Sequence, residues 1–233
     1  MRPPSLARPV LLALSLALAA RGADFLAPDA LDWRTLVPPP PAPGSVADES
    51  ERFTVLLIEA DRTPAQAELA RQHQSYTVFN LLRPVLGDWA TPENLPKLAA
   101  LFQQATVEAR PFNTAAKDTY ARPRPHLALP QLKTAYDVKP DGYAYPSGHA
   151  TGSALHAMLL AALLPEHAAD WEKQAELVRL SRLYGGAHYP SDVIAGRRLG
   201  EALAREMLKS PKMQQRLEEV RAELAPFLRK KAA

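Results

Sequence analysis

The sequence predicts an all-α fold built as a single domain, and three observations lead to this prediction. Alanine is abundant while aromatic residues make up only 7% of the chain, a composition that favours helices. Threonine–proline pairs of the kind that begin helices recur, and apolar residues repeat at helical spacing, whereas strand signals are weak. A chain of 233 residues is also long enough to bury one sizeable core.

The first segment of the chain has the pattern of a secretory signal peptide. Arg2 and Arg8 mark a basic start, residues 9–20 are apolar, and small residues follow. The apolar stretch is too short to span a bilayer; an uncleaved anchor or a buried N-terminal helix is the alternative interpretation. We therefore expect residues 1–23 to be a signal peptide, cleaved between residues 19 and 23. The mature protein would then be periplasmic or secreted, with no membrane span.

A proline-rich arm is expected over residues 24–50. It contains the run Pro38-Pro-Pro-Pro-Ala-Pro-Gly44, which favours extended polyproline geometry and fits neither a helix interior nor a central strand. The helical domain is then expected over residues 51–233.

The helices of that domain are predicted from caps and stripes. Thr63-Pro64 with Gln66 predicts a helix start with a capping box, and Thr91-Pro92 predicts the next start. Residues 150–164 are almost all small or apolar, as in a central buried helix. Apolar stripes predict the other helices, over residues 98–105, 171–184, 199–207 and 213–224, the last of which should end before Pro226.

Charge and cysteine content exclude several function classes. The formal net charge is only +3 and there is no run of Lys and Arg, so nucleic acid is not an expected partner. The chain has no cysteine, which excludes disulfides, thiol catalysis and cysteine-based zinc sites.

Reactive polar residues gather in two predicted loops, over residues 122–146 and 185–190, and in the helix ends beside them. They fall into three segments. The first holds Lys117 and, after six residues, Arg124-Pro125; the second is Pro146-Ser147-Gly148-His149; the third holds Ser181-Arg182, His188 and Asp192. Loops placed by a rigid scaffold are common sites of chemistry.

The cations of these segments suit an anionic phosphoryl group, whose transfer depends largely on positioning and electrostatic stabilisation. Arg124 and Arg182 can each hold two oxygens in a planar fork, and Lys117 adds a compact charge. Ser147 and Gly148 precede the apolar helix, so backbone N–H groups at its start would point at a bound anion. A second Arg-Pro pair begins at Arg122; the spacing from Lys117 selects Arg124 as the clamp, with Arg122 in reserve.

The histidines supply the reactive groups. Asp192 lies four residues after His188, where its carboxylate can fix the imidazole tautomer and leave the other nitrogen free to attack. His149 then remains to protonate the leaving oxygen. Each segment alone has an ordinary structural explanation, such as a surface cation or a helix-starting turn. All three together specify about eleven positions at defined spacings, which is very improbable by accident.

Together these segments resemble the three-part signature of the type 2 phosphatidic acid phosphatase superfamily: K-x6-R-P, P-S-G-H and S-R-x5-H-x3-D. The residues around the motifs are most similar to those of the soluble branch, the class A bacterial non-specific acid phosphatases. These segments are Gly142-Tyr-Ala-Tyr-Pro-Ser-Gly-His149 and Ser181-Arg-Leu-Tyr-Gly-Gly-Ala-His-Tyr-Pro-Ser-Asp192. The signal peptide, length and arm extend the resemblance over nearly the whole mature chain. One departure is Ala150, where a threonine often follows P-S-G-H.

The resemblance implies an all-helical fold shared with haloperoxidases, no metal and no cofactor, and an exported acid phosphatase acting on a broad range of small phosphomonoesters such as nucleotides. It implies a phosphohistidine on His188, His149 as general acid, Asp192 supporting His188, and phosphate binding by Lys117, Arg124, Ser147, Gly148 and Arg182. Phosphotransferase activity and a homo-oligomeric state are left open. Four residues flank the motifs as candidates for shaping the pocket: Tyr143, Tyr145, Tyr184 and His126.

Three other functions compete with this one. A vanadium-dependent haloperoxidase would use the same residues to hold vanadate, but such chains are generally much longer. A membrane lipid-phosphate phosphatase would need transmembrane helices, which the sequence does not predict. A non-catalytic phosphate-binding protein would not need both a nucleophile and an acid.

Overall fold

The computed structural model describes residues 25–27, 29–138 and 142–232, and in this part of the chain it contains helices and no strands. The all-α prediction is therefore confirmed. The helices are α1 (Trp33–Leu36), α2 (Val46–Ala60), α3 (Pro64–Gln72), α4 (Phe79–Leu86), α5 (Pro96–Tyr120), α6 (Pro125–Ala128), α7 (Gly148–Leu163), the short 3-10 helix η1 (Pro165–His167), α8 (Ala168–Tyr184), α9 (Pro190–Lys209) and α10 (Pro211–Ala232).

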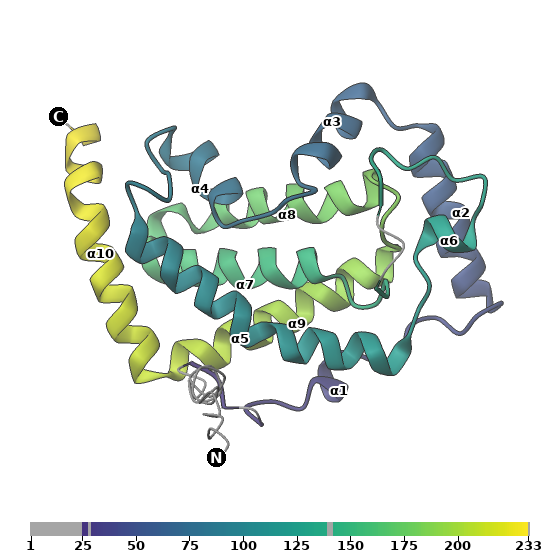
Figure 1. Ribbon diagram of the computed structural model, residues 1–233, viewed down its shortest axis with the longest axis horizontal. Helices are drawn as coiled ribbons and strands as arrows, with labels where there is room; N and C mark the ends of the chain where they lie inside the picture. Colours follow the sequence, from purple (N-terminus) through teal and green to yellow (C-terminus); the bar gives the residue numbers. More distant parts are fainter. Residues whose placement is uncertain (1–24, 28, 139–141, 233) are drawn as a thin grey trace, which may run out of the picture.

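Helix α7 is the central element of the fold. It is buried along most of its length and packs mainly against α9 and α8, as its nearly uniform apolar sequence predicts. Figure 1 shows α8 and α9 running along α7, α5 crossing in front of it, α10 at one end of the molecule, and α2 and α6 at the other. None of the helices in the described residues is both long and apolar enough to cross a membrane.

The close crossing of α7 and α9 depends on Gly196 and Gly200. A Cβ atom at Gly196 would clash with the backbone oxygen of Ser147, and one at Gly200 with that of Thr151. Because both glycines lack a side chain, the two helices approach until the Ser147 N–H donates to the Asp192 carbonyl at 2.8 Å. This contact joins the start of α7 to the start of α9, and so brings the second and third motif segments together.

The helix starts show where local signals suffice. Helix α3 begins at Pro64 with the capping box between Thr63 and Gln66, as predicted. The start predicted at Thr91-Pro92 is wrong, because α5 begins only at Pro96. Residues 91–94 form a turn instead, in which the Thr91 hydroxyl accepts from the Asn94 N–H at 3.3 Å and the Leu95 N–H donates to the Thr91 carbonyl. A second proline competes for the first-turn position.

The predicted end of the last helix before Pro226 is also wrong. Helix α10 continues through this proline, although proline removes one backbone hydrogen bond. Just beyond it, the Phe227 ring stacks on Trp89 with centroids 4.8 Å apart and an interplanar angle of 2°. This tertiary contact holds the last turns of the helix in place.

The N-terminal part of the described chain folds onto the domain. Helix α2 begins inside the predicted arm, at Val46, with the Ser45 hydroxyl accepting from the Asp48 N–H. The Tyr145 hydroxyl donates to the Pro38 carbonyl, which ties the proline run to the segment before α7. The predicted signal peptide, residues 1–23, lies outside the described residues. The division into arm and domain stays a prediction.

Candidate active site

The three motif segments converge at one end of α7. Lys117 lies in the last turn of α5, Arg124 is the N-cap of α6, and Arg182 lies in the last turn of α8. Ser147 is the N-cap of α7, and Asp192 lies in the first turn of α9. The remaining predicted residues complete the group: Gly148 and His149 begin α7, and His188 lies in the loop before α9.

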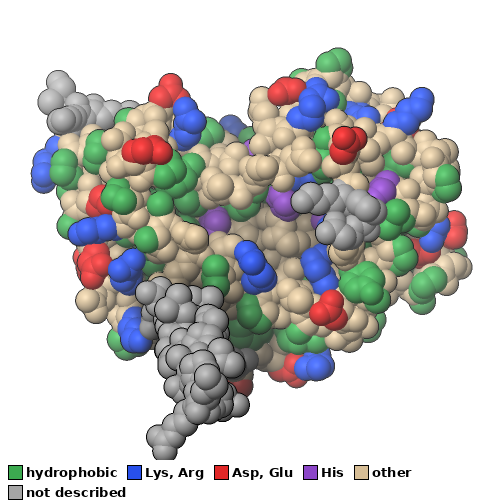
Figure 2. Space-filling view, in the orientation of Figure 1, with side chains coloured by type: hydrophobic (Ala, Val, Ile, Leu, Met, Phe, Trp, Pro, Cys, Tyr) green, Lys and Arg blue, Asp and Glu red, His purple; other side chains and the backbone are tan. Residues whose placement is uncertain are grey.

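These elements enclose a cavity of about 360 Å³. Six of the eight predicted site residues line it, and Ser147 and Asp192 lie just behind its wall. In Figure 2, histidine side chains are visible in the hollowed middle of the face, with Lys and Arg side chains beside them. The lining residues are Gln74, Ser75, Lys117, Arg124, Tyr136, Asp137, Val138, Gly148, His149, Arg182, Ala187 and His188.

His188 has a defined tautomer. Its Nδ1 lies 3.2 Å from Asp192 Oδ2, and because a carboxylate only accepts, Nδ1 carries the hydrogen. Its Nε2 then holds the lone pair and accepts from Arg124 Nη1 at 3.2 Å. The side chain is only 3% exposed. Burial, followed by the charges of Arg124 and Lys117, holds the pKa of His188 well below 6.5, so the imidazole is neutral.

Asp192 is fully buried and has a partner for each oxygen. Its Oδ2 accepts from the Tyr189 N–H at 2.8 Å as well as from His188, and its Oδ1 accepts from Arg122 Nη1 at 2.8 Å. Burial raises the pKa of this carboxyl to about 6, and Arg122 opposes that rise. Asp192 is thus both an N-terminal residue of α9 and the orienting group of His188.

Arg122 belongs to a buried ion-pair network behind Asp192. Its guanidinium reaches Asp192, Glu51 at 2.8 Å and Asp48 at 3.4 Å, and it lies over the Tyr189 ring at 4.0 Å from the centroid. Two of these carboxylates come from α2, more than 70 residues away in the chain. Arg122 does not line the cavity, so the choice of Arg124 for the cavity agrees with the geometry, and Arg122 has a different place.

Lys117 and Arg182, two of the three cations of the cavity, donate to backbone carbonyls. Lys117 Nζ donates to the Tyr143 carbonyl and, at 3.4 Å, to the Ala144 carbonyl. Arg182 Nη1 donates to the His73 carbonyl at 2.7 Å, while its Nε is buried without a hydrogen-bond partner. Within the described residues, neither side chain forms an ion pair with a carboxylate. Burial and the neighbouring Arg124 lower the pKa of Lys117 to about 8 and that of Arg182 to about 10, so both remain charged at neutral pH.

The start of α7 presents donors to the same cavity. The Ser147 oxygen accepts from the Ala150 N–H at 3.4 Å, which leaves its hydroxyl hydrogen available. Gly148 is exposed and follows at the first helical position, where backbone N–H groups have no partner within the helix. A helix start with this geometry favours an anion.

His149 lies in the first turn of α7 and lines the same cavity as His188. Its Nε2 lies 3.2 Å from the Gln74 carbonyl, so Nε2 donates and Nδ1 is the nitrogen that gains or loses a proton. Burial lowers the pKa of His149; the Gln74 carbonyl opposes this shift, and the charges of Arg124 and Lys117 add to it.

The sequence did not predict every residue of the cavity. Tyr136 lines it from the long loop before α7, with Arg182 at 5.2 Å from its ring centroid, and Gln74 and Ser75 line it from the segment after α3. None of these lies in a motif, so only the fold reveals them. The four flanking residues Tyr143, Tyr145, Tyr184 and His126 are absent from the lining. In the described part of the chain, no group of three His, Cys, Asp or Glu side chains could hold a metal ion.

Comparison with known proteins identifies the family. The sequence profile of the PAP2 superfamily matches residues 98–216, a span that contains every predicted site residue. The non-specific acid phosphatase of Salmonella typhi is 29% identical over 196 residues, covering 81% of this chain and 78% of the relative. That of Providencia stuartii is 26% identical over 204 residues, covering 84% and 82%.

A solved structure gives the same fold. A bacterial vanadium-dependent iodoperoxidase superposes with a TM-score of 0.61 at 18% identity, covering 77% of this chain and 54% of that one. This likeness concerns the fold alone. The profile match spans just over half of the chain, so the protein belongs to the PAP2 superfamily, and its acid phosphatase relatives identify it as a phosphatase.

Proposed function

We propose that the protein is an exported acid phosphatase that hydrolyses a broad range of phosphomonoesters through a phosphohistidine on His188, without a metal ion. The observation that carries the proposal is the orientation of His188. Asp192 holds its Nδ1–H, and its Nε2 lone pair is turned toward Arg124 in a cationic cavity. A neutral, oriented imidazole beside anion-binding groups is what nucleophilic attack on phosphorus requires.

A bound phosphate would supply hydrogen-bond acceptors for donors that line the cavity. The buried Nε of Arg182 has no hydrogen-bond partner, and an unpaired buried donor is costly until an acceptor arrives. Lys117, Arg124 and the start of α7 add further donors around the same space. Together they would bind the equatorial oxygens and stabilise the charge that develops in the transition state.

The first chemical step forms a bond between His188 Nε2 and phosphorus while the bond from phosphorus to the leaving oxygen breaks. The electron pair goes to the leaving oxygen, and His149 Nδ1 supplies its proton. Asp192 stabilises the positive charge that the substituted imidazole acquires. In the second step water attacks phosphorus, the N–P bond breaks, and His149 takes a proton from the water. An alcohol in place of water would give phosphotransfer.

The two histidines set an optimum on the acid side of neutrality. His149 must be protonated, and because its pKa is lowered, activity should fall as the pH rises past that value. The Asp192 carboxylate must also stay ionised to orient His188, and because burial raises its pKa to about 6, activity should fall as the pH decreases through that value. The expected pH profile of kcat/KM is bell-shaped. A single limb that keeps rising above neutrality would contradict this pairing.

Metal independence follows from the charges that are already present. Three side-chain cations surround the cavity, and they would do the electrostatic work that a metal pair does in other phosphatases. The test is p-nitrophenyl phosphate hydrolysis after exhaustive chelation. We expect full activity, and a loss that only a divalent metal restores would disprove metal independence. Vanadate should inhibit this reaction; vanadate-dependent halide oxidation would favour a haloperoxidase instead.

The covalent intermediate has a direct test. Rapid quenching of the enzyme with a ³²P-labelled monoester in alkali should trap a phosphoenzyme whose label is lost in acid, as a phosphoramidate bond is. His188→Ala should give no label, whereas His149→Asn should still be labelled by an ester with a good leaving group. Label that persists in His188→Ala would overturn the assignment. Export is tested separately, by the N-terminal residue of the protein recovered from the periplasm or medium, expected between residues 20 and 24.

A further inference from the structure

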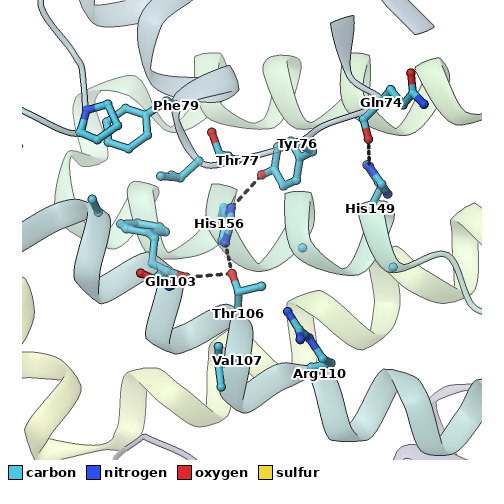
Figure 3. A pocket seen from close by; sticks show the side chains of 16 residues that line it. Gln74, Tyr76, Thr77, Phe79, Gln103, Thr106, Val107, Arg110, His149 and His156 are labelled. Atoms are coloured by element: carbon cyan, nitrogen blue, oxygen red, sulfur yellow. Dashed lines mark hydrogen bonds between the residues drawn. The ribbon is translucent and has the colours of Figure 1, made fainter. Parts of the chain in front are cut away.

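A second cavity adjoins the phosphate cavity at His149. It has a volume of about 670 Å³, nearly twice that of the phosphate cavity, and Gln74, Gly148 and His149 line both. One wall is a face of α5, the other is the segment 76–79, and the floor is α7, as Figure 3 shows. We call this cavity the groove.

The groove is elongated along α5. Its α5 wall consists of residues spaced three and four apart from Ala99 to Arg110, which is one face of a helix and spans about 16 Å at 1.5 Å per residue. Its floor is Gly148, Gly152 and His156, each four residues apart. At Gly152 the floor lies close to the wall formed by residues 76–79, because a Cβ atom there would be in van der Waals contact with the Tyr76 ring at 3.5 Å.

The chemistry of the groove changes along its length. His149 and Arg110 lie toward the phosphate end, on opposite sides, and Phe79 lies at the far end (Figure 3). Between these ends the lining is mainly apolar, and it includes Val107, which is 54% exposed. An exposed, unpartnered apolar wall beside a catalytic cavity is typical of a ligand site.

The buried histidine of the floor adds no charge. His156 is held on both ring nitrogens, by the Tyr76 hydroxyl at 2.8 Å and the Thr106 hydroxyl at 2.8 Å. Burial lowers the pKa of His156 to about 3, so the imidazole is neutral and its hydrogen-bonding groups are satisfied. At His156, an apolar ligand would therefore meet a floor whose imidazole nitrogens are both already hydrogen-bonded.

We propose that the groove binds the leaving group of the substrate, and that the enzyme prefers monoesters whose leaving group is a linear aliphatic chain. This inference rests on the proposed function, because the leaving oxygen must lie near His149, where the groove begins. From that point a chain can run along α5 toward Ala99. The α5 wall is about 16 Å long, which is longer than a single ring system. An aliphatic chain can fill a long apolar groove without needing polar partners.

The test is a series of monoalkyl phosphates from ethyl to decyl, each kept below its micelle-forming concentration. We expect kcat/KM to rise about two- to fourfold for each methylene that enters the groove and then to level off when the groove is full. Octylphosphonate, which cannot be hydrolysed, should bind more tightly than ethylphosphonate by isothermal titration calorimetry. A flat series, or a higher kcat/KM for adenosine monophosphate than for octyl phosphate, would overturn the preference.

A matched pair of variants on α5 locates the effect. Ala99 lines the far end of the groove, whereas its neighbour Ala100 is exposed and does not line it. Ala99→Phe should shorten the groove, so that kcat/KM levels off at a shorter chain and octylphosphonate loses its advantage. Ala100→Phe should match the wild type. Equal chain dependence in both variants would refute the groove as the site.

Failure of this inference and failure of the proposed function give different results. If the protein hydrolyses ethyl phosphate and p-nitrophenyl phosphate but shows no chain dependence, only the groove is misassigned. If it hydrolyses no monoester, the proposed function itself is wrong. The wild-type alkyl series decides the question even where Ala99→Phe does not fold.

Discussion

The two sides of the His188 ring lie in opposite electrostatic surroundings. On the Nε2 side, which we call the front, Lys117, Arg124 and Arg182 bring three cations to an open cavity. On the Nδ1 side, the rear, the charges alternate and are paired: Asp192 with Arg122, and Arg122 with Asp48 and Glu51. The front is accessible to a ligand, whereas the rear is packed and satisfied.

This difference separates binding from orientation. The front cations lower the pKa of His188 and would attract an anion. Their favourable electrostatic interaction is therefore made only with bound phosphate or in the transition state. The rear network makes its contacts in every state, and it fixes the ring tautomer and position. A front substitution should therefore change affinity and rate, while a rear substitution should change stability and pH dependence.

The largest effect should come from the ring itself. His188→Ala removes the nucleophile that both sides serve, so hydrolysis of every phosphomonoester should fall by about 10⁴-fold or more, as for other nucleophile deletions. Turnover of p-nitrophenyl phosphate and an alkyl phosphate measures this, with circular dichroism to check the fold. Appreciable residual activity on p-nitrophenyl phosphate would mean that the nucleophile is elsewhere.

His149→Asn tests the front at the leaving group. General acid catalysis typically contributes about 10²–10⁴-fold, and its benefit shrinks when the leaving group departs readily without a proton. The variant should therefore lose far more kcat/KM on an alkyl phosphate than on p-nitrophenyl phosphate. Asparagine is polar and similar in size to the ring's inner part, which limits repacking. The same loss on both substrates would exclude His149 as the acid.

Arg124→Ala tests the front as a phosphate clamp. Loss of a charge-assisted contact that strengthens in the transition state should lower kcat/KM by about 10²–10³-fold and weaken competitive inhibition by inorganic phosphate. Arg124→Lys is the control, because it keeps the charge but loses the planar fork; it should recover only part of the loss. Full recovery would show that charge alone matters at this position.

The sequence could predict the front because its residues lie in short motifs. Lys117 and Arg124 are joined by a six-residue spacing, and Arg182 and His188 belong to one segment; the fold brings them to one cavity. The same patterns predicted the helices that carry them. What failed were boundaries next to prolines, at Pro96 and Pro226, where tertiary packing overrides the local signal.

Apart from Asp192, the rear could not be predicted from spacing. The spacing from Lys117 selects Arg124, but no local pattern indicates which groups the Arg122 side chain contacts. The partners of Arg122 become visible only in the fold, where α2 places Asp48 and Glu51 against it. Helix α2 itself begins in a segment that the proline run made look like an extended arm. The groove could not be predicted for the same reason, because its two walls and its floor come from separate parts of the chain.

Arg122→Ala tests the rear and should have the smallest effect on phosphate binding. It leaves Asp192, Asp48 and Glu51 without their shared cation, so the free energy of unfolding at pH 7 should fall by about 3–5 kcal/mol, as when one partner of a buried pair is removed. Urea denaturation measures this fall. This loss in the free energy of unfolding should shrink as the pH decreases. The pKa of the Asp192 carboxyl is raised, so the carboxyl becomes protonated and the unpaired buried charge is removed.

The pH profile of Arg122→Ala then sharpens the comparison. Arg122 opposes the rise of the Asp192 pKa, so its loss should raise that pKa further and move the acid limb of kcat/KM to higher pH. Inhibition by inorganic phosphate should change little, since Arg122 does not line the cavity. Arg122→Lys, which keeps a cation there, should return the acid limb toward its original position. If Arg122→Ala instead weakened phosphate inhibition as much as Arg124→Ala, the division into a binding front and an orienting rear would be wrong.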